Sequence, residues 1–513
     1  MRYQWYDAPL SNSVWTVTIS RMKFFSKFAR KLFGGSSTEH AAPATADRRT
    51  SAKRVIPHDQ HNIDRHRLDD NASKVVYRLT DSGHEGYLVG GCVRDLLMDL
   101  RPKDFDVATS ASPEEAHELF RRSRLIGRRF KLLHVRFGRE IIEVATFRAS
   151  HDQPENDGGE KGRQSAAGMI LRDNVYGTLA EDALRRDFTV NSLYYDLNDH
   201  SIIDFANGYE DMHKRTIRMI GDPADRYRED PVRMLRAARF AAKLEFKIEP
   251  ATAAPINELA PLLRNIAPAR LFDESLKLFQ SGHAERVYHL MQQYDLFAQL
   301  FPAPAAAIRN PQGYPVEELI LNAFRNTDRR LRQRKSVTPA FLYAALLWYP
   351  MQHRMNQMLE DDQMPPLQAL HEAANEVIGK QVRSTAIPRR FSTPIREIWE
   401  MQLRLPRHHG KRAERLTEHP RFRASYDLLL LRENSGEDLD GLSTWWTEYQ
   451  KENPVQRVYT EHRRDHDDKP RRRRRRTGDN HQGNNTGGHN NEHRDQGERG
   501  PRRSSNRRSE SKD

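Results

Sequence analysis

The sequence predicts an α+β head with a mixed, mostly antiparallel sheet, followed by an all-helical neck and body. Two segments of alternating apolar and polar residues, KLLHVRF and EIIEVATF, flank Gly138 and predict a β-hairpin. Beyond about residue 212 the strand signals fade and helical periodicity dominates. Both ends of the chain differ in composition from the middle. This difference predicts a disordered N-terminal extension and a disordered basic tail.

Composition limits the class of protein. The 513 residues carry a net charge of +13, which indicates a polyanionic partner, either nucleic acid or an anionic membrane surface. The single cysteine, Cys92, excludes an internal disulfide and is best explained as a small buried side chain. Because no apolar run approaches the roughly 18 residues that span a bilayer, we expect a protein that is soluble or at most peripheral. The lone cysteine fits a reducing cytoplasm.

Residues 1–58 form the predicted N-terminal extension. Within it, residues 22–33 place phenylalanines and a leucine on one helical face, with lysines and an arginine largely opposite. This pattern fits an amphipathic helix lying peripherally on the inner membrane surface, and it fits equally a helix docked on a partner. The following residues, 34–54, are rich in small residues and predict a linker. The natural start is either Met1 or Met22.

The predicted head covers residues 59–211. It has a helix at 71–80, a strand and tight turn at GYLVGG, a strand at KDFDVAT, and a helix at 113–121 capped by Ser112, Pro113 and Glu115. The polar stretch 150–167 predicts a long loop. A helical neck (212–280) and an all-helical body (281–460) follow, with helices expected at 230–243, 268–300, 315–330, 338–350, 365–380 and 391–404.

Residues 461–513 form the predicted tail. They contain no aliphatic or aromatic residue, and their sixteen Lys/Arg and ten Asp/Glu leave a net charge of +6. Such a segment is either solubilising or binds RNA by neutralising phosphates, and we favour RNA contact. The contact is expected at six consecutive arginines: Arg471, Arg472, Arg473, Arg474, Arg475 and Arg476.

Asp104 and Asp106 are the first candidate catalytic residues. On a strand they would share a face, about 6.6 Å apart. Two such carboxylates can hold a pair of Mg²⁺ ions, although an ordinary polar loop is the commoner origin of a D-x-D triplet. Upstream, Gly90 and Gly91 join an apolar strand end to a helix, a turn that can direct backbone N–H groups toward a phosphate. Arg94 lies one turn further on and can reach the same anion.

A third acid, Asp187, follows Arg186 directly before the apolar segment 188–195. This pair is either an ion pair at a helix cap or a third active-site carboxylate beside an arginine that contacts a triphosphate or ribose.

The segment EDPVRMLRAARF predicts a helix that begins at Asp230 and Pro231. Its arginines, Arg233, Arg236 and Arg239, recur at a spacing of three and share one face. They form either a solvated surface or an anion-binding ridge. Asp230 and Arg233 together would offer planar groups with which a base can be recognised.

In this order, LVGGCVRDLL, KDFDV, RRDFTVNSL and EDPVRMLRAARFAAK resemble motifs of the nucleotidyltransferase family that includes bacterial tRNA CCA-adding enzymes and bacterial poly(A) polymerases. The resemblance covers about residues 75–280. It implies that Asp104 and Asp106 bind two Mg²⁺ ions and that Asp187 completes the catalytic set. It also implies that the nucleotide is bound by Gly90, Gly91, Arg94, Arg186, Asp230, Arg233, Arg236 and Arg239, with Asp230 and Arg233 at the base and Arg236 and Arg239 at the triphosphate.

The stretch LIGRRFKLLHV, residues 125–135, is similar to the element that separates bacterial poly(A) polymerases from CCA-adding enzymes. Residues 171–189 also resemble the poly(A) polymerases. We therefore expect a polynucleotide adenylyltransferase that adds AMP from ATP to RNA 3′ ends. RNA and ATP are its expected partners, together with RNA-decay proteins. Two alternatives remain open: a tRNA CCA-adding nucleotidyltransferase and a non-catalytic RNA-binding scaffold.

Overall fold

The computed structural model describes residues 52–127, 131–149 and 175–454. The predicted amphipathic helix at 22–33, the predicted loop at 150–167 and the arginine run at 471–476 lie outside the described residues.

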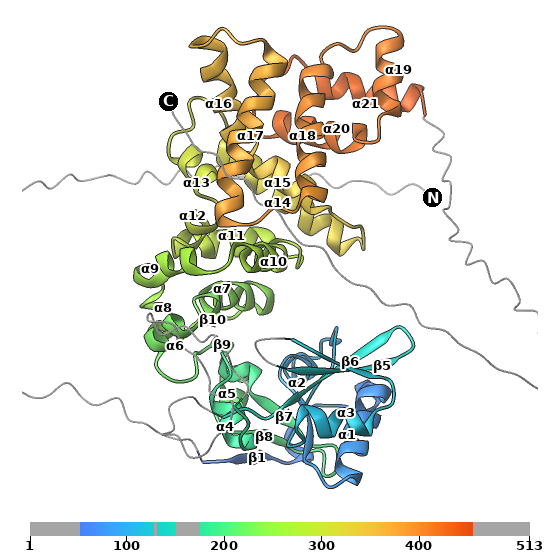
Figure 1. Ribbon diagram of the computed structural model, residues 1–513, viewed down its shortest axis with the longest axis vertical. Helices are drawn as coiled ribbons and strands as arrows, with labels where there is room; N and C mark the ends of the chain where they lie inside the picture. The colour runs from blue at the N-terminus through green and yellow to red at the C-terminus, as the bar shows by residue number, and fades with distance from the viewer. Residues whose placement is uncertain (1–51, 128–130, 150–174, 455–513) are drawn as a thin grey trace, which may run out of the picture. The chain divides into compact units, whose positions relative to one another are not determined.

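An eight-stranded mixed sheet forms the head (Figure 1). Its order is β1-β8-β7-β2-β3-β6-β5-β4, and its neighbours are antiparallel except β3 and β6, which are parallel. The predicted α+β fold with a mostly antiparallel sheet is confirmed. The strands are β1 (Arg54–Ile56), β2 (Gly86–Val89), β3 (Asp106–Thr109), β4 (Ser123–Ile126), β5 (Leu132–Phe137), β6 (Glu140–Thr146), β7 (Leu193–Tyr195) and β8 (Ile202–Asp204).

Both faces of the central strands are buried. In β2, Leu88 packs into the cluster that contains Val75 and Leu79 of helix α1, whereas the next residue, Val89, packs into a separate cluster. Successive side chains of a strand point to opposite faces, so this division places helices on both sides of the sheet. The helices of the head are α1 (Asp70–Asp81), α2 (Gly91–Leu97), α3 (Pro113–Leu119), α4 (Leu179–Leu184) and α5 (Gly208–His213).

Local signals predicted several head elements correctly. Strands β5 and β6 form the expected hairpin across Gly138, which has φ +62°. The cap of α3 is a complete capping box between Ser112 and Glu115. Strand β1 lies upstream of residue 59, where the head was predicted to begin, yet it belongs to the sheet because it pairs with β8.

The neck is helical except for one short strand pair. Strands β9 (Thr216–Ile217) and β10 (Lys247–Ile248) pair in parallel, although the sequence predicts no strand beyond residue 212. Two residues are too few to show alternation, which explains why no strand was predicted at these positions. The helices are α6 (Pro223–Glu229), α7 (Val232–Leu244), α8 (Pro250–Ala253), α9 (Ile256–Leu259) and α10 (Pro268–Phe279).

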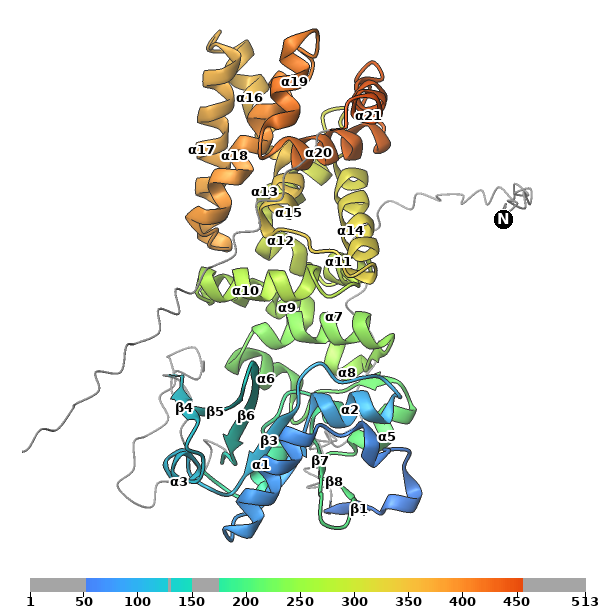
Figure 2. The same cartoon turned by 90° about the vertical axis from the view of Figure 1, so that its right-hand side faces the viewer.

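The body is all-helical in its described part, as predicted. Helix α16 packs along α17, and α15 packs along α18 (Figure 2). The predicted helix at 268–300 is divided into three by Gly282 and Asp295, both in the left-handed region. The body helices are α11 (Ala284–Gln293), α12 (Leu296–Leu300), α13 (Pro302–Arg309), α14 (Val316–Arg332), α15 (Pro339–Leu346), α16 (Trp348–Glu360), α17 (Pro366–Ser384), α18 (Arg389–Arg404), α19 (Lys411–Glu418), α20 (Phe422–Asn434) and α21 (Leu442–Glu452). Among the described helices, none has the length and apolar character needed to cross a membrane.

Candidate active site

The turn between β2 and α2 depends on glycine. Gly90 has φ +74°, and a Cβ atom there would lie 3.3 Å from the Asn191 carbonyl oxygen and 3.4 Å from Arg186 Nη1. Its N–H donates to the Leu193 carbonyl at 3.0 Å. The turn is therefore fixed against the start of β7 and the residues just before it, and α2 begins at Gly91.

Asp106 is the first residue of β3, and Asp104 lies in the loop before it. The expectation that both acids share a strand is therefore wrong. The pairing of β2 with β3 ends at Val89 and Asp106, because the chain turns away from the sheet at Gly90 and offers Asp104 no partner. The Asp104 side chain is 74% exposed, and Lys103 lies 4.0 Å away.

Glu143, which the sequence did not single out, lies beside Asp106. The two residues are in register in the parallel pair β3–β6, so their side chains share a face of the sheet. On the other side of Glu143, His134 Nε2 lies 3.1 Å from its Oε1 atom. A signal was present in EIIEVATF, because the alternation buries Ile142 and Val144 and leaves Glu143 on the opposite face.

The acids at the start of β3 create an excess of negative charge. Asp106 remains accessible to solvent, but the surrounding protein atoms and then the Glu143 carboxylate raise its pKa to about 6. Arg186 opposes this rise and Asp104 adds to it. A divalent cation would relieve such repulsion. The described residues contain no cluster of three or more metal-ligating side chains. The acids nevertheless fit Mg²⁺, which usually takes a few carboxylates together with substrate phosphates and water.

Asp187 is held by several donors. Its Oδ1 accepts from the Phe188 N–H at 2.8 Å and from Asn191 Nδ2 at 3.2 Å. Its Oδ2 lies 2.6 Å from both Nε and Nη2 of Arg236, a neck residue on α7. Burial alone would raise its pKa, but the Arg236 guanidinium together with the hydrogen bonds from Asn191, Arg236 and the Phe188 N–H outweighs burial and holds the pKa at about 2. Asp187 is therefore ionised and joins the head to the neck.

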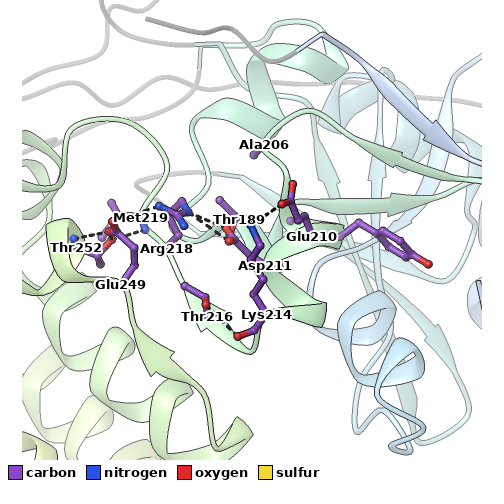
Figure 3. A network of polar contacts seen from close by, with 12 residues as sticks. Thr189, Ala206, Glu210, Asp211, Lys214, Thr216, Arg218, Met219, Glu249 and Thr252 are labelled. Atoms are coloured by element: carbon purple, nitrogen blue, oxygen red, sulfur yellow. Dashed lines mark hydrogen bonds and ion pairs between the residues drawn. The ribbon is translucent and has the colours of Figure 1, made fainter. Parts of the chain in front are cut away.

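A polar network fixes the segment that follows Asp187 (Figure 3). Thr189 Oγ1 donates to Asp211 Oδ2 at 2.8 Å, and Arg218 Nε binds the same carboxylate at 3.0 Å. Arg218 also pairs with Glu249 at 3.3 Å, and Glu249 accepts from the Thr252 N–H. The network ties this segment to α5, β9 and α8, which limits the freedom of Asp187.

Three guanidinium groups surround the ring of Phe240 on α7. Those of Arg94, Arg236 and Arg239 lie 5.3, 5.2 and 4.8 Å from its centroid. Arg94 is only 3% exposed, and it donates to Asp95 and to Asn191 Oδ1. Stacking fixes all three arginines in the folded protein, and ion pairs with Asp95 and Asp187 add to this for Arg94 and Arg236.

Positive charge exceeds negative charge around Phe240. Burial, and then Arg236, lowers the pKa of Arg239 to about 10. Burial also lowers the pKa of Lys243, with Asp95 opposing and Arg94 adding to the effect. Arg239 Nε is buried and has no hydrogen-bond partner among the described residues. Such a cluster is suited to a multiply charged anion.

Arg186 forms an ion pair with Asp182 and not with its neighbour Asp187. Its Nη2 lies 2.9 Å from Asp182 Oδ2, and its Nε donates to the Tyr194 hydroxyl at 2.9 Å. Because it also lowers the pKa of Asp106, its charge acts at the start of β3.

Asp230 and Arg233 are not paired with each other in the structure, contrary to the pairing that the sequence suggests. Arg233 Nη1 donates to Glu229 Oε2 at 2.7 Å, whereas Asp230 Oδ2 accepts from Arg270 on α10 at 2.7 Å. Glu229 lies one helical turn before Arg233, and Arg270 is supplied by another helix. Helix α7 begins one residue later than predicted, and Asp230 Oδ1 accepts from the Val232 N–H at 3.3 Å.

Comparison with known families shows that the head is that of a nucleotidyltransferase. Residues 86–218 match the family model described as the poly A polymerase head domain. Residues 245–308 match a probable RNA and SrmB-binding site of polymerase A, and residues 362–478 match the polymerase A arginine-rich C-terminus.

Whole-chain relatives define the family. The chain is 47% identical to poly(A) polymerase I of Salmonella typhimurium strain LT2, a match that covers 87% of this chain and 95% of the relative. The chain therefore belongs to the bacterial poly(A) polymerase family, as its motifs predict, and it is a polynucleotide adenylyltransferase. A CCA-adding enzyme of Lactobacillus helveticus is 38% identical over 43% of this chain and 52% of its own length, which supports the alternative less well.

Solved structures share the fold. The apo form II of a CCA-adding enzyme superposes with a TM-score of 0.52 at 22% identity, covering 75% of this chain and 85% of that chain. At this identity the likeness shows a common architecture and no more.

Proposed function

We propose that the enzyme adds AMP from ATP to RNA 3′ ends without a template, at the start of β3, with Asp104 and Asp106 as its metal-binding carboxylates. The observation that carries this assignment is the register of β3 with β6, which places the Asp106 and Glu143 carboxylates side by side, where the charge of Arg186 also acts on Asp106. The whole-chain relatives support the choice of adenylate.

Two Mg²⁺ ions, when bound, would lower the pKa of the RNA 3′-hydroxyl and stabilise charge on the departing pyrophosphate. Asp104 and Asp106 supply the oxygen ligands that this ion prefers. Glu143 is a further candidate ligand, because it lies in register with Asp106.

We keep Asp187 in the proposed catalytic set and propose that it acts through Arg236. Both of its oxygens already accept hydrogen bonds, and the pair with Arg236 fixes that guanidinium near Phe240. Arg236, Arg239 and Arg94 would then bind the triphosphate and neutralise the pyrophosphate as the 3′-oxygen displaces it from the α-phosphorus.

The remaining nucleotide contacts follow from the same arrangement. Gly90 and Gly91 allow a phosphate to approach the backbone, and Arg186 adds positive charge near Asp106. Asp230 and Arg233 would recognise the base, and Glu229 holds the Arg233 side chain in place. Contacts of the tail with RNA, of residues 22–33 with a membrane, and of the enzyme with RNA-decay proteins stay predictions.

The test is nucleotide incorporation with Mg²⁺, each labelled nucleoside triphosphate, and either unstructured RNA or tRNA lacking its 3′ CCA. A long ladder with ATP alone on unstructured RNA is the expected result. Three additions to tRNA followed by a stop would indicate CCA addition, and no incorporation would indicate a scaffold. Asp106→Ala must lose several orders of magnitude in rate, and near-normal incorporation by this variant would refute the assignment.

A distinct readout separates the roles of the acids. Glu143→Gln should raise the Mg²⁺ concentration needed for half-maximal rate, since it removes a proposed ligand, whereas Asp106→Asn should lose activity at every Mg²⁺ concentration. Asp187→Asn should mainly raise the KM for ATP, because it releases Arg236. If Asp187→Asn changed the Mg²⁺ requirement and left the KM for ATP unchanged, Asp187 would instead be a ligand.

A further inference from the structure

Two adjoining cavities in the body lie between helices α14, α15, α18 and α20. Their volumes are about 560 and 430 Å³. They share four lining residues, Asn326, Arg330, Arg423 and Asp427, and therefore adjoin each other. We call this feature the body groove.

The lining of the body groove is strongly basic. Its charged members are one carboxylate, Asp427, and seven arginines: Arg325, Arg329, Arg330, Arg332, Arg390, Arg421 and Arg423. Three of the seven form ion pairs, with Arg325 joined to Glu285 and Glu318, Arg421 to Glu397, and Arg423 to Asp427. Within the described part of the chain, no ion pair joins the other four to a carboxylate. The groove therefore offers several guanidinium groups to an anion.

One end of the groove is aromatic and apolar. Phe341, Phe391, Pro394 and Ile398 line it, and both phenylalanines are only partly buried. The guanidinium of Arg390 lies 4.9 Å from the centroid of the Phe391 ring. Arginines beside accessible rings are the combination with which proteins hold single strands, because the arginines neutralise phosphates and the rings stack on bases of any sequence.

We propose that the body groove binds a single-stranded segment of the RNA substrate, upstream of its 3′ end. Phosphates would contact Arg329, Arg330 and Arg332 on α14 and Arg423 on α20, and bases would stack at Phe341 and Phe391. This inference rests on the proposed function, since the ligand is the substrate of that reaction. Contacts with RNA phosphates and base faces do not depend on the RNA sequence. Such binding suits an enzyme that extends RNA without a template.

The test compares two triple variants of the full chain that remove the same charge. Arg329→Gln/Arg332→Gln/Arg423→Gln neutralises the groove. Arg383→Gln/Arg412→Gln/Arg415→Gln neutralises three exposed arginines of α17 and α19 that do not line it. Binding of fluorescent oligo(A) of 6 to 30 nucleotides is measured from 50 to 400 mM salt, together with AMP incorporation into the same primers. Thermal unfolding of both variants establishes that they fold.

The groove variant should bind long primers more weakly, by up to about 100-fold at 0.1 M salt if all three arginines contact phosphates. The slope of log K against log salt should become shallower by about 2. Incorporation into a saturating six-nucleotide primer should stay unchanged, which separates loss of the groove from loss of the active site. The proposal is overturned if the control variant loses as much affinity, or if the groove variant keeps wild-type affinity and slope, as it would if an acidic protein were the ligand. If wild-type protein incorporated no AMP into any primer, the proposed function itself would fail.

Discussion

The ion pair between Asp187 and Arg236 makes a quantitative prediction about stability. Arg236 and the hydrogen bonds from Asn191 and the Phe188 N–H together outweigh burial and hold the Asp187 pKa at about 2, whereas an unfolded chain leaves an aspartate near 3.8. The depressed pKa means that the folded state favours the ionised form. The shift of about 1.8 corresponds to about 2 kcal/mol of stability at neutral pH.

The sign of the pH dependence follows from the direction of that shift. Stability from Asp187 is fully present above the unfolded pKa and is lost as the pH falls through the folded pKa, between about 4 and 2. By linkage, about 1 kcal/mol of it is lost at pH 3. Asp187→Asn should therefore cost about 2 kcal/mol at pH 7 and about half as much at pH 3.

Urea unfolding of four proteins measures this directly: wild type, Asp187→Asn, Arg236→Gln and the double variant. We expect a coupling free energy of about 2 kcal/mol at pH 7, because the pair is largely buried, with Asp187 only 11% exposed. A coupling below about 0.5 kcal/mol, or a cost of Asp187→Asn that did not change between pH 7 and pH 3, would refute the reasoning.

Three further predictions follow from other contacts. Asp106→Asn should abolish activity yet raise the Tm of the metal-free protein at pH 7.5. The raised pKa of Asp106 means that its ionisation costs stability as the pH rises from about 4 to 6, and the asparagine removes this cost. An unchanged or lower Tm would contradict this prediction. Gly208→Ala should destabilise the protein by about 3 kcal/mol or more, because its Cβ would lie 2.1 Å from the Thr189 carbonyl oxygen. The matched control is Gly379→Ala in helix α17, which has open space around it and should stabilise the protein by up to about 1 kcal/mol. Urea unfolding measures both variants, and equal effects of the two would be inconsistent with this packing. Glu229→Gln should lower the preference for ATP over CTP in kcat/KM several-fold, because its Oε2 orients both Arg226 and Arg233, and an unaltered preference would show that Glu229 is dispensable for base selection.

Elements set by neighbours in sequence were predictable. Ser112 and Glu115 form their capping box within one helical turn, and the β5–β6 hairpin closes over Gly138 between adjacent alternating segments. Asp106 was also identifiable as a candidate, because it forms a D-x-D triplet with Asp104. In the capping box and the hairpin the interacting atoms lie a few residues apart, so the local sequence pattern is enough to predict the geometry.

Partners supplied by distant segments were not predictable in the same way. Glu143 lies beside Asp106 only because β6 pairs in parallel with β3, a register that no local pattern specifies. Likewise, Asp230 pairs with Arg270, forty residues further along the chain, and not with nearby Arg233. The choice between these partners depends on how α6, α7 and α10 pack, which periodicity alone does not determine.

The parallel pairing of β3 with β6 also determines when during folding the acidic cluster can form. A parallel pair requires a crossover, and here the chain passes through α3, β4 and β5 before Glu143 reaches Asp106. Contacts between segments so far apart form late, because the entropy of closing the intervening chain must first be lost. We therefore expect the carboxylates to converge after the rate-limiting step of folding. A divalent cation held between them should slow unfolding while leaving the rate of refolding unchanged.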